Sequence, residues 1–438
     1  MMSNRPGARL LDQTAEFLRS GYLFASRVRR AAGLEPGSDS PVPIRLLGRS
    51  SLLVRGEEGV RFFYDTDLFR RDGAMPAFVR GPLFGAGAVH GLDGDAHRAR
   101  KNALADLAYD DSRVAAFATC VSEELEEMLM TLSREQSGSV YDATTVAFGR
   151  AAFRWAGVPV STGEADRRAH QMSRLLDTFG RPATNPLAWV ERARLDRWAT
   201  GLIRGARDGA RDGHTRVAAD SVLAAIADLR DENGALVSDH TAAVELQNLT
   251  RPTVAVARFA AFAAVALVEH PGWARRIREA TTAAGSLTDI PEAVAFAQEV
   301  RRVYPFVPML PALAAVDTEI GGCPVHHGQR VFLDILGTNT DPNHWDDAGT
   351  FDPERFLDVA DAEELAAFIP QGGAGVRTGH RCPGEKIAVT ALSATVAALC
   401  RPGVEISDDA DDLTFPWTRM LTRPATGVRL RYRATATT

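Results

Sequence analysis

The sequence predicts a mainly α-helical fold with a small β region. Long stretches between residues 94 and about 302 place apolar residues three and four positions apart, the spacing that gives a helix one apolar face. The strand-like segments are short and lie toward the two ends of the chain. The chain shows no internal repeat and no linker, and its length alone would suggest two or three domains, with one unit over residues 1–438 as the alternative.

Each part of the chain has its own pattern. After an N-terminal helix, residues 43–65 contain the segments IRLLG, SLLVRG and VRFFYD between Gly-containing turns, which predicts a small antiparallel sheet. Amphipathic stretches such as RVAAFATCVSEELEEMLMTLSRE and DSVLAAIADLRDE predict helices in the middle of the chain. Strand-like pieces return at AAVDTEI and QRVFLDIL. The segment TGVRLRYRA predicts a closing strand.

The segment HTAAVELQNLTRPTVAVARFAAFAAVALVEHP predicts one long helix. Pro252 removes a backbone donor from it and should loosen the turn before the proline. The apolar residues 259–268 are about half of the roughly 20 residues that a bilayer-spanning helix needs. We therefore expect a buried helix here and no membrane span.

Composition narrows the class of protein. Apolar residues make up 45% of the chain and charged residues 24%, as in globular proteins with a sizeable core. The net charge of -6 is spread over mixed signs, so nucleic acid is not an expected partner. The start shows no targeting segment, and the four cysteines form no CxxC pair that would suggest a zinc site or a disulfide framework. A reducing cytoplasm is the expected location.

Cys382 is the candidate metal ligand. It lies in the Gly-rich loop QGGAGVRTGHRCPGEK, directly before an apolar helix. Free N–H groups at that helix start, those of Gly384 and Glu385, favour the thiolate form that iron requires. His380, beside the cysteine, offers a hydrogen-bonding group for acidic cofactor substituents, as does Arg381. A cysteine before a helix is by itself more often a buried structural residue, and its neighbours must decide between the two roles.

Those neighbours carry a family resemblance. Gly-His-Arg-Cys-Pro-Gly-Glu resembles the cysteine-ligand loop of the cytochrome P450 superfamily, and the preceding Gln-Gly-Gly is similar to its fatty acid peroxygenase branch. Glu299 and Arg302 match the superfamily's Glu-x-x-Arg pair, with Arg355 of FDPERF as a third member. Alone, such a pair is ordinarily a solvated surface contact. The resemblance implies one triangular haem-thiolate domain that holds haem b through Cys382.

One departure from the superfamily pattern bears on the branch. Superfamily loops usually carry Phe seven residues and Gly four residues before the cysteine, where this chain has Gly375 and Thr378. The peroxygenase loop is longer and lacks those two residues. The departure therefore weakens the general match and strengthens the match to peroxygenases.

Arg251 is the candidate substrate anchor. No Asp or Glu lies between residues 246 and 268, so a buried Arg251 would need an anion from elsewhere. Periodicity alone does not choose between Arg251 and Arg258, and an arginine that reaches solvent or a haem propionate is the alternative. Oxygen-using superfamily members carry an acid and an alcohol where this chain has Arg251 and Pro252. The resemblance implies that the arginine anchors a fatty acid whose carboxylate serves as general acid and base.

The segment GPLFGAGAVHGLDGDAHRARK supplies further candidates. By resemblance, His97, Arg100 and Lys101 bind the haem propionates, although surface solvation is as good an interpretation of Lys101. His90 stands where alkene-forming members often have His and hydroxylating members often have Gln, so it is a candidate for steering the product. A hydrogen-bonded histidine without that role is the alternative.

Two aromatic residues match positions that line the acyl tunnel of the family. They are Phe84 and Phe306, and both also suit an ordinary apolar core.

Together these features predict an enzyme that uses hydrogen peroxide to oxidise medium or long fatty acids near the carboxyl end. The products would be 2- or 3-hydroxy acids, a terminal alkene, or a mixture, and separate redox proteins would not be required. A dioxygen-dependent monooxygenase with reductase partners is the alternative. A haem-binding sensor or carrier without catalysis is a third hypothesis, from another class. The sequence leaves chain length, stereochemistry, physiological oxidant and oligomeric state open.

Overall fold

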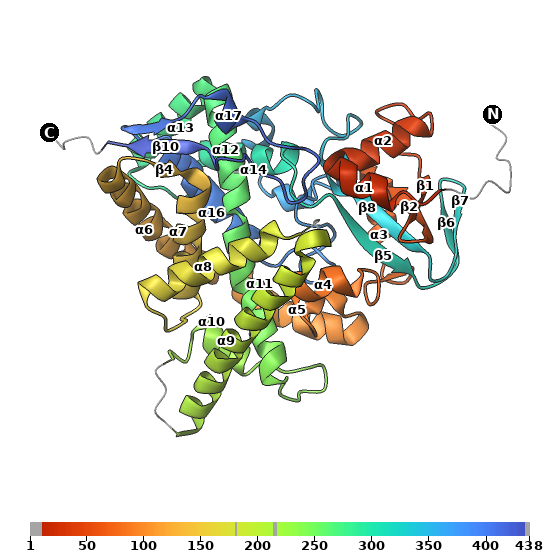
Figure 1. The fold of residues 1–438 in the computed structure, drawn as a ribbon, viewed down its shortest axis with the longest axis horizontal. Coiled ribbons are helices and arrows are strands. Elements are labelled where there is room, and N and C mark those ends of the chain that lie inside the picture. Colours follow the sequence, from red (N-terminus) through yellow and green to blue (C-terminus); the bar gives the residue numbers. More distant parts are fainter. Residues whose placement is uncertain (1–10, 180–181, 213–216, 434–438) are drawn as a thin grey trace.

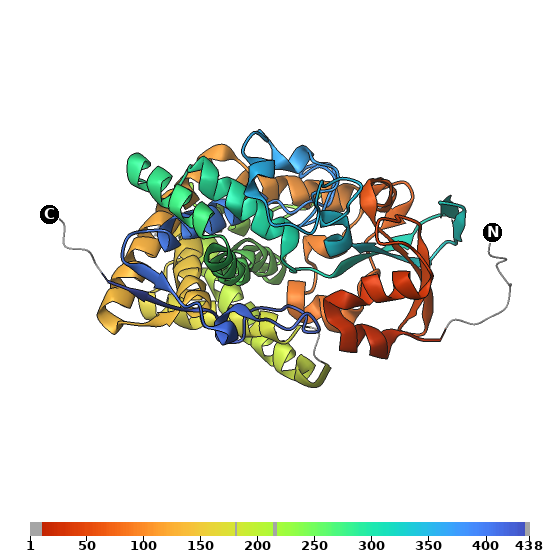
Figure 2. The same ribbon diagram turned by 90° about the horizontal axis from the view of Figure 1, so that it is seen from above.

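The computed structural model describes residues 11–179, 182–212 and 217–433. The chain forms a mainly helical body of roughly triangular outline, with the N-terminal helices and a mixed sheet at one corner (Figure 1). The view from above places the same sheet at the same end, away from the long helices (Figure 2). This arrangement confirms the predicted fold class.

The N-terminal corner is built around a sheet of five strands among the described residues, in the order β1-β2-β8-β5-β3. The strands are β1 Val42–Leu46, β2 Arg49–Val54, β3 Phe69–Arg70, β5 Met309–Ala314 and β8 Arg330–Asp334. β1 and β2 form the expected antiparallel hairpin, with Ile44 opposite Ser51. β2 also pairs in parallel with β8, so the sheet joins segments from both ends of the chain. Helices α1 Thr14–Ser20 and α2 Phe24–Ala31 belong to the same corner.

The third predicted strand is wrong. VRFFYD lies in helix α3, Gly56–Tyr64, rather than in the sheet. Val60, Phe63 and Tyr64 are buried at helical spacing, and acidic residues occupy the first turn, where the helix dipole favours them. A short apolar run suits a strand or a buried helix face equally well, and here the helical period prevails.

The predicted helical middle is confirmed. Its main elements are α5 Gly94–Ala108, α6 Asp111–Glu135, α7 Val140–Trp155, α8 Thr162–Asp177, α9 Asn185–Asp212, α13 Pro271–Ala284 and α14 Pro291–Val303. A further helix, α4 Ala77–Phe84, precedes the predicted region. DSVLAAIADLRDE forms a shorter helix than expected, α10 Val222–Ala227. The chain then turns back through Asn233 and Gly234, so that Arg230 pairs with Leu236.

The long central helix is interrupted later than expected. α11 Asp239–Ala255 continues through Pro252, and the break falls at Val256, before α12 Ala257–Glu269. At the break the N–H of Val256 bonds to the carbonyl of Thr253, a tighter turn than that of an α-helix. The combined helix Asp239–Glu269 is long and apolar enough to cross a membrane, yet 83% of its most apolar window is buried inside the protein. α12 is therefore the buried core helix that was predicted.

The C-terminal part adds strands of two smaller sheets and returns to the core. Its elements are β6 Thr318–Ile320, β7 Cys323–Val325, α15 Ile335–Asn339, α16 Glu385–Leu399, β9 Val404–Ile406, α17 Ala410–Leu413 and β10 Arg429–Tyr432. β10 pairs with β9 and with β4 Gly138–Ser139 in one of these sheets, and β6 pairs with β7 in the other. α16 packs against α6, α12 and α14, which places the loop before it at the centre of the molecule. The candidate metal ligand lies in that loop.

Candidate active site

Cys382 is partly buried and lies just before α16. Its N–H donates to the carbonyl of Gln371 over 3.1 Å, which holds the loop against the preceding Gly-rich segment. Burial raises the pKa of the Cys382 thiol, while Lys101 and the N–H of Gly384 oppose that rise. Of the two N–H groups expected at the sulfur, Gly384 supplies one. The N–H of Glu385 bonds instead to the Cys382 carbonyl over 3.3 Å.

A buried network of arginine and carboxylate side chains holds this loop in place. Glu385 is fully buried and accepts hydrogen bonds from Arg301, which also donates to Gln371 over 2.8 Å. Arg381 contacts Glu385 at 3.1 Å and donates to the carbonyl of Phe368 over 3.0 Å. Arg381 is thus bonded to other groups of the protein, whereas the sequence interpretation expected it to bind acidic groups of a cofactor. Arg301, which no motif singled out, is a main support of the cysteine loop.

Basic side chains gather beside the cysteine. His97 and His380 stack with ring centroids 4.2 Å apart, and Lys101 Nζ donates to the carbonyl of Arg381. Burial and then neighbouring positive charge lower the pKa of His97 to about 4 and that of His380 to about 2. Burial lowers the pKa of Lys101 to about 8. Arg71, which the sequence did not reveal, contributes to the lowering at both histidines.

This arrangement fits haem b. A buried thiolate is a suitable iron ligand, and the cluster of Arg71, His97, Lys101 and His380 offers donors for an anion carrying two carboxylates. An anion among them would offset the cost of burying the two cations, Arg71 and Lys101. These residues would therefore hold the propionates of a haem whose iron is bound by Cys382.

Arg100 has a protein partner instead. Its Nη1 lies 3.0 Å from Oε1 of Glu245, and both side chains are buried. The sequence interpretation placed Arg100 with the propionate ligands, but its charge is already compensated by a carboxylate from α11. The difference arises because side chains close together on α5 point to different partners.

Arg251 lies on α11 without a carboxylate partner among the residues of the structural description. Its side chain is buried at 4% exposure, and Nη2 donates to Oδ1 of Asn248 over 3.0 Å. Its Nε is buried without a hydrogen-bond partner. Burial, and then the nearby Arg192, lower the pKa of Arg251 to about 9. Pro252, the next residue, cannot donate a helical hydrogen bond to the Asn248 carbonyl.

Arg258, the other candidate, is paired. Its Nη2 donates to Asp177 over 2.8 Å, across the gap between α12 and α8. The helix break at Val256 separates the two arginines, although they are seven residues apart in sequence. The structure therefore leaves Arg251, and not Arg258, as the buried cation available to a substrate.

Phe84 and His90 lie beside Arg251. The Arg251 guanidinium is 5.8 Å from the centroid of the Phe84 ring, and the Phe84 and His90 rings stack at 4.0 Å. His90 is surrounded by protein atoms, yet the residue is exposed because neighbouring side chains leave a large part of its surface uncovered. Burial and then Arg251 lower the pKa of His90 to about 3, so its imidazole is neutral at physiological pH.

Phe306 lies on the apolar side of this region. Its ring stacks on Phe259 at 4.7 Å, and it packs with Leu83 and Phe179 around Ala255, one helical turn after Arg251. Leu83 and Phe179 line a mostly apolar cavity of about 430 Å³ between α1, α4, α8, α9 and β5, which Arg330 and Asn185 also border. Leu83 and Phe179 thus connect this cavity with the apolar residues around Ala255, while Arg251, Phe84 and Phe306 do not line it.

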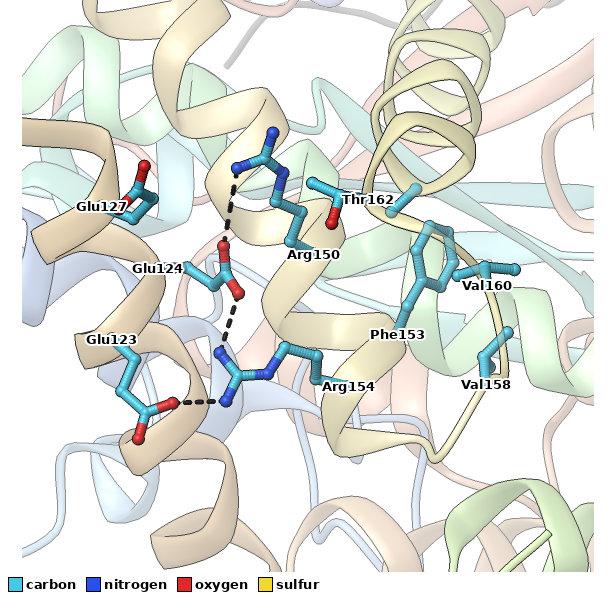
Figure 3. Close-up of a pocket in the computed structure, with 10 residues that line it drawn as sticks. Glu123, Glu124, Glu127, Arg150, Phe153, Arg154, Val158, Val160 and Thr162 are labelled. Atoms are coloured by element: carbon cyan, nitrogen blue, oxygen red, sulfur yellow. Dashed lines mark hydrogen bonds and ion pairs between the residues drawn. The ribbon is translucent and has the colours of Figure 1, made fainter. Parts of the chain in front are cut away.

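A second cavity, of about 380 Å³, lies apart from this site between α6, α7 and α8 (Figure 3). Its charged groups satisfy one another, because Glu124 lies between Arg150 and Arg154 and Arg154 also binds Glu123. No uncompensated charge there calls for a ligand.

The Glu-x-x-Arg residues come together as the spacing predicts. Arg302 Nε and Nη2 each lie 2.7 Å from the carboxylate of Glu299, and both side chains are fully buried. Arg355 approaches the same carboxylate at 3.7 Å. Arg302 also donates to the carbonyls of Asn339, Ala348 and Thr350 and so ties α14 to the loop that follows α15. This is a buried network and not a surface ion pair.

Comparison with known proteins agrees with this geometry. A variant of cytochrome P450SP alpha (CYP152B1) superposes with a TM-score of 0.85 at 36% identity, covering 96% of this chain and 98% of that one. Ligand-free cytochrome P450 OleT superposes with a TM-score of 0.88 at 28% identity, covering 98% and 99%. The chain belongs to the cytochrome P450 family. Its cofactor is therefore haem bound through a thiolate.

Sequence matches of this cytochrome P450 are more local. The Cytochrome P450 family model matches residues 213–418. Isoflavone 2'-hydroxylase of Glycyrrhiza echinata is 36% identical over 118 residues, which is 26% of this chain and 22% of that protein. Cytochrome P450 734A5 of Oryza sativa subsp. japonica is 31% identical over 150 residues, or 27% of its length. These matches thus span only about a quarter of the curated relatives.

Two solved neighbours of this cytochrome P450 carry ligands. Cytochrome P450SP alpha has been solved in complex with (R)-ibuprophen, at 35% identity and a TM-score of 0.85. A variant of cytochrome P450 OleT has been solved in complex with arachidonic acid, at 28% identity and a TM-score of 0.87. Both ligands are carboxylic acids with a largely apolar body.

Proposed function

We propose that this cytochrome P450 uses hydrogen peroxide to oxidise medium or long fatty acids near the carboxyl end. The single observation that carries the proposal is Arg251, a buried guanidinium with a neutral amide as its hydrogen-bond partner. A buried charge without a counter-charge is costly, and a substrate carboxylate would offset that cost. Haem b bound at Cys382 would supply the redox chemistry that activates peroxide and oxidises the acyl chain.

The residues around Arg251 suit a single-chain acid. Arg251 would hold the carboxylate, while Phe84, Phe306 and the cavity of about 430 Å³ would receive the acyl tail. The carboxylate end is thereby fixed, so the carbon atoms next to it are held closest to the reaction centre. This geometry favours oxidation at the second or third carbon, or loss of the carboxyl group.

The proton chemistry also favours peroxide over dioxygen. Residues 246–268 contain no Asp or Glu, and the nearest acid of α11, Glu245, is already engaged by Arg100, Asn248 and the N–H of Val89. The substrate carboxylate on Arg251 would take that place and move the proton of the peroxide. Redox partner proteins would then not be needed, and a cytoplasmic location agrees with unpaired cysteines throughout the described chain.

The solved neighbours support the substrate class. Cytochrome P450SP alpha and cytochrome P450 OleT bind ligands that combine a carboxylate with an apolar body. His90, neutral and stacked on Phe84, is the residue that we propose steers the product between hydroxy acid and alkene.

The test is turnover of purified, haem-loaded protein with myristate and hydrogen peroxide in the absence of any reductase. We expect hydroxymyristate, the one-carbon-shorter alkene, or both, detected by mass spectrometry. Tetradecanol, which lacks the carboxylate, is the matched control and should not turn over. Product formed only with dioxygen, NADPH and reductase proteins would favour the monooxygenase alternative and reject the peroxide mechanism.

A further inference from the structure

A chain of hydrogen bonds leads from Arg251 to a buried carboxylate on the same helix. Oδ1 of Asn248 accepts from Arg251 over 3.0 Å, and Nδ2 of the same amide donates to Oε2 of Glu245 over 3.1 Å. Glu245 is fully buried. The neutral amide of Asn248 thus stands between a buried cation and a buried anion.

The charge of Glu245 sets the direction of this amide. A carboxylate can only accept hydrogen bonds, so the Asn248 NH2 group must face Glu245. The Asn248 oxygen is then left to face Arg251, which can only donate. A neutral group at position 245 can donate as well as accept, and both amide orientations would become available to Asn248.

Arg100 opposes the protonation of Glu245. Burial raises the pKa of the Glu245 carboxyl, while Asn248 and Arg100 hold that rise down. Arg100 Nη1 lies 3.0 Å from Oε1 of Glu245. This contact gives Arg100 a function other than propionate binding.

The same carboxylate also holds the His90 turn. Oε1 of Glu245 accepts from the backbone N–H of Val89 over 2.8 Å, and Val89 begins the short turn Val89–Gly91 that carries His90. Glu245 is therefore linked by hydrogen bonds to two parts of the site. One is Arg251 on α11, through Asn248, and the other is the turn before α5 that carries His90.

We propose that Glu245 is a positioning residue that orients Arg251 through the amide of Asn248. The inference rests on the proposed function, because it treats Arg251 as the group that binds the substrate carboxylate. Glu245 and Asn248 do not themselves meet the substrate. They hold the guanidinium in one orientation and so determine how tightly, and in what position, the acid is bound.

The experiment is a double-mutant cycle on fatty acid binding by the haem-loaded protein. Myristate is titrated against wild type, Asn248→Ala, Glu245→Gln and the double variant, with the absorbance of the bound haem as the signal. Asn248→Ala should raise Kd about tenfold, the usual effect of losing a hydrogen bond to a charged group. Glu245→Gln should raise it by a smaller factor, and the double variant should match Asn248→Ala alone. That equality is expected because Glu245 acts through the amide.

Imidazole, a neutral haem ligand, is the second readout. Its Kd should stay unchanged in the same variants, whereas general damage to the fold would change both constants. Thr250→Val is the matched control on α11, because it removes a buried hydroxyl that bonds only to its own helix at the Leu246 carbonyl. Its myristate Kd should equal that of wild type.

The outcomes separate the two proposals. Wild-type protein that binds imidazole but not myristate would reject the proposed function and this inference with it. Myristate binding by wild type, with effects of the two substitutions that multiply or with an unchanged Kd in Glu245→Gln, would overturn the positioning role alone.

Arg100 provides an independent check. The variant Arg100→Met/Glu245→Gln removes both charges together, so that no unpaired carboxylate remains. We expect its haem content to equal that of wild type. Loss of haem would indicate that Arg100 binds a haem propionate and would contradict its role as the partner of Glu245.

Discussion

Replacing Arg251 by Met removes the one buried cation on α11 that we assign to the substrate. Methionine keeps much of the apolar stem of arginine while losing the charge. Arg251 is only 4% exposed, so little solvent screening weakens its attraction for a carboxylate. Truncating one partner of such a buried pair costs about 2 to 5 kcal/mol. In wild-type protein, substrate binding also relieves part of the cost of the unpaired charge on Arg251. A loss of binding free energy near 3 kcal/mol corresponds to roughly a hundredfold rise in Kd.

The pH dependence of myristate binding tests specifically whether Arg251 is the group that binds the carboxylate. Burial lowers the pKa of Arg251 to about 9, and only the protonated guanidinium attracts a carboxylate. Affinity for myristate should therefore be full below that pKa and fall by about tenfold for each pH unit above it. Arg251→Met should lack this alkaline loss. Lys101, whose pKa is lowered to about 8, also titrates in this range, but it is present in both proteins.

The assay is the myristate Kd of wild type and Arg251→Met between about pH 7 and pH 10.5, taken from the absorbance of bound haem. The ratio of the two constants cancels titrations that both proteins share. It should be near a hundred at neutral pH and shrink toward one at the alkaline end. A ratio that stays constant over the whole range, or a variant that binds as tightly as wild type, would refute the role of Arg251.

Three further predictions follow from buried contacts. Arg302→Met removes the nearest counter-charge of fully buried Glu299 and leaves Arg355 at 3.7 Å as its remaining cation, so it should cost about 3 kcal/mol in the free energy of unfolding, measured in guanidinium chloride. A loss below about 1 kcal/mol would contradict the buried network. Cys382→Ala should purify without haem, and a carbon monoxide spectrum unchanged from wild type would exclude thiolate ligation. His90→Gln should shift the ratio of alkene to hydroxy acid. Because burial lowers the pKa of His90 to about 3, the wild-type ratio should not vary with His90 protonation between about pH 6 and pH 9.

The elements that sequence reasoning identified correctly are those with local signals. The long helices repeat their apolar residues over many turns, so their period is unambiguous. The segment VRFFYD is too short for that, and only its packing decided for helix α3. Pro252 marks a point of weakness in the central helix, yet the break lies at Val256, because helix hydrogen bonds on either side of a proline can still form.

The residues of the candidate site also fall into those with a local sequence signal and those without one. The loop around Cys382, the spacing of Glu299 and Arg302, and the lack of acids near Arg251 are all visible within short segments of sequence. Arg71 has no such signal, since it reaches the histidines only after the chain has folded. Arg192 likewise comes close to Arg251 from another helix.

By itself, then, the sequence determined which residues could carry chemistry: a cysteine before a helix, and several arginines and histidines on apolar segments. Only the tertiary structure decided which of the cations remain without a counter-charge. Arg100 is neutralised by Glu245, which is 145 residues away in the chain, and Arg258 by Asp177, 81 residues before it. The physical reason is that compensation of a buried charge depends on distance in space, and local spacing says nothing about partners brought together by helix packing.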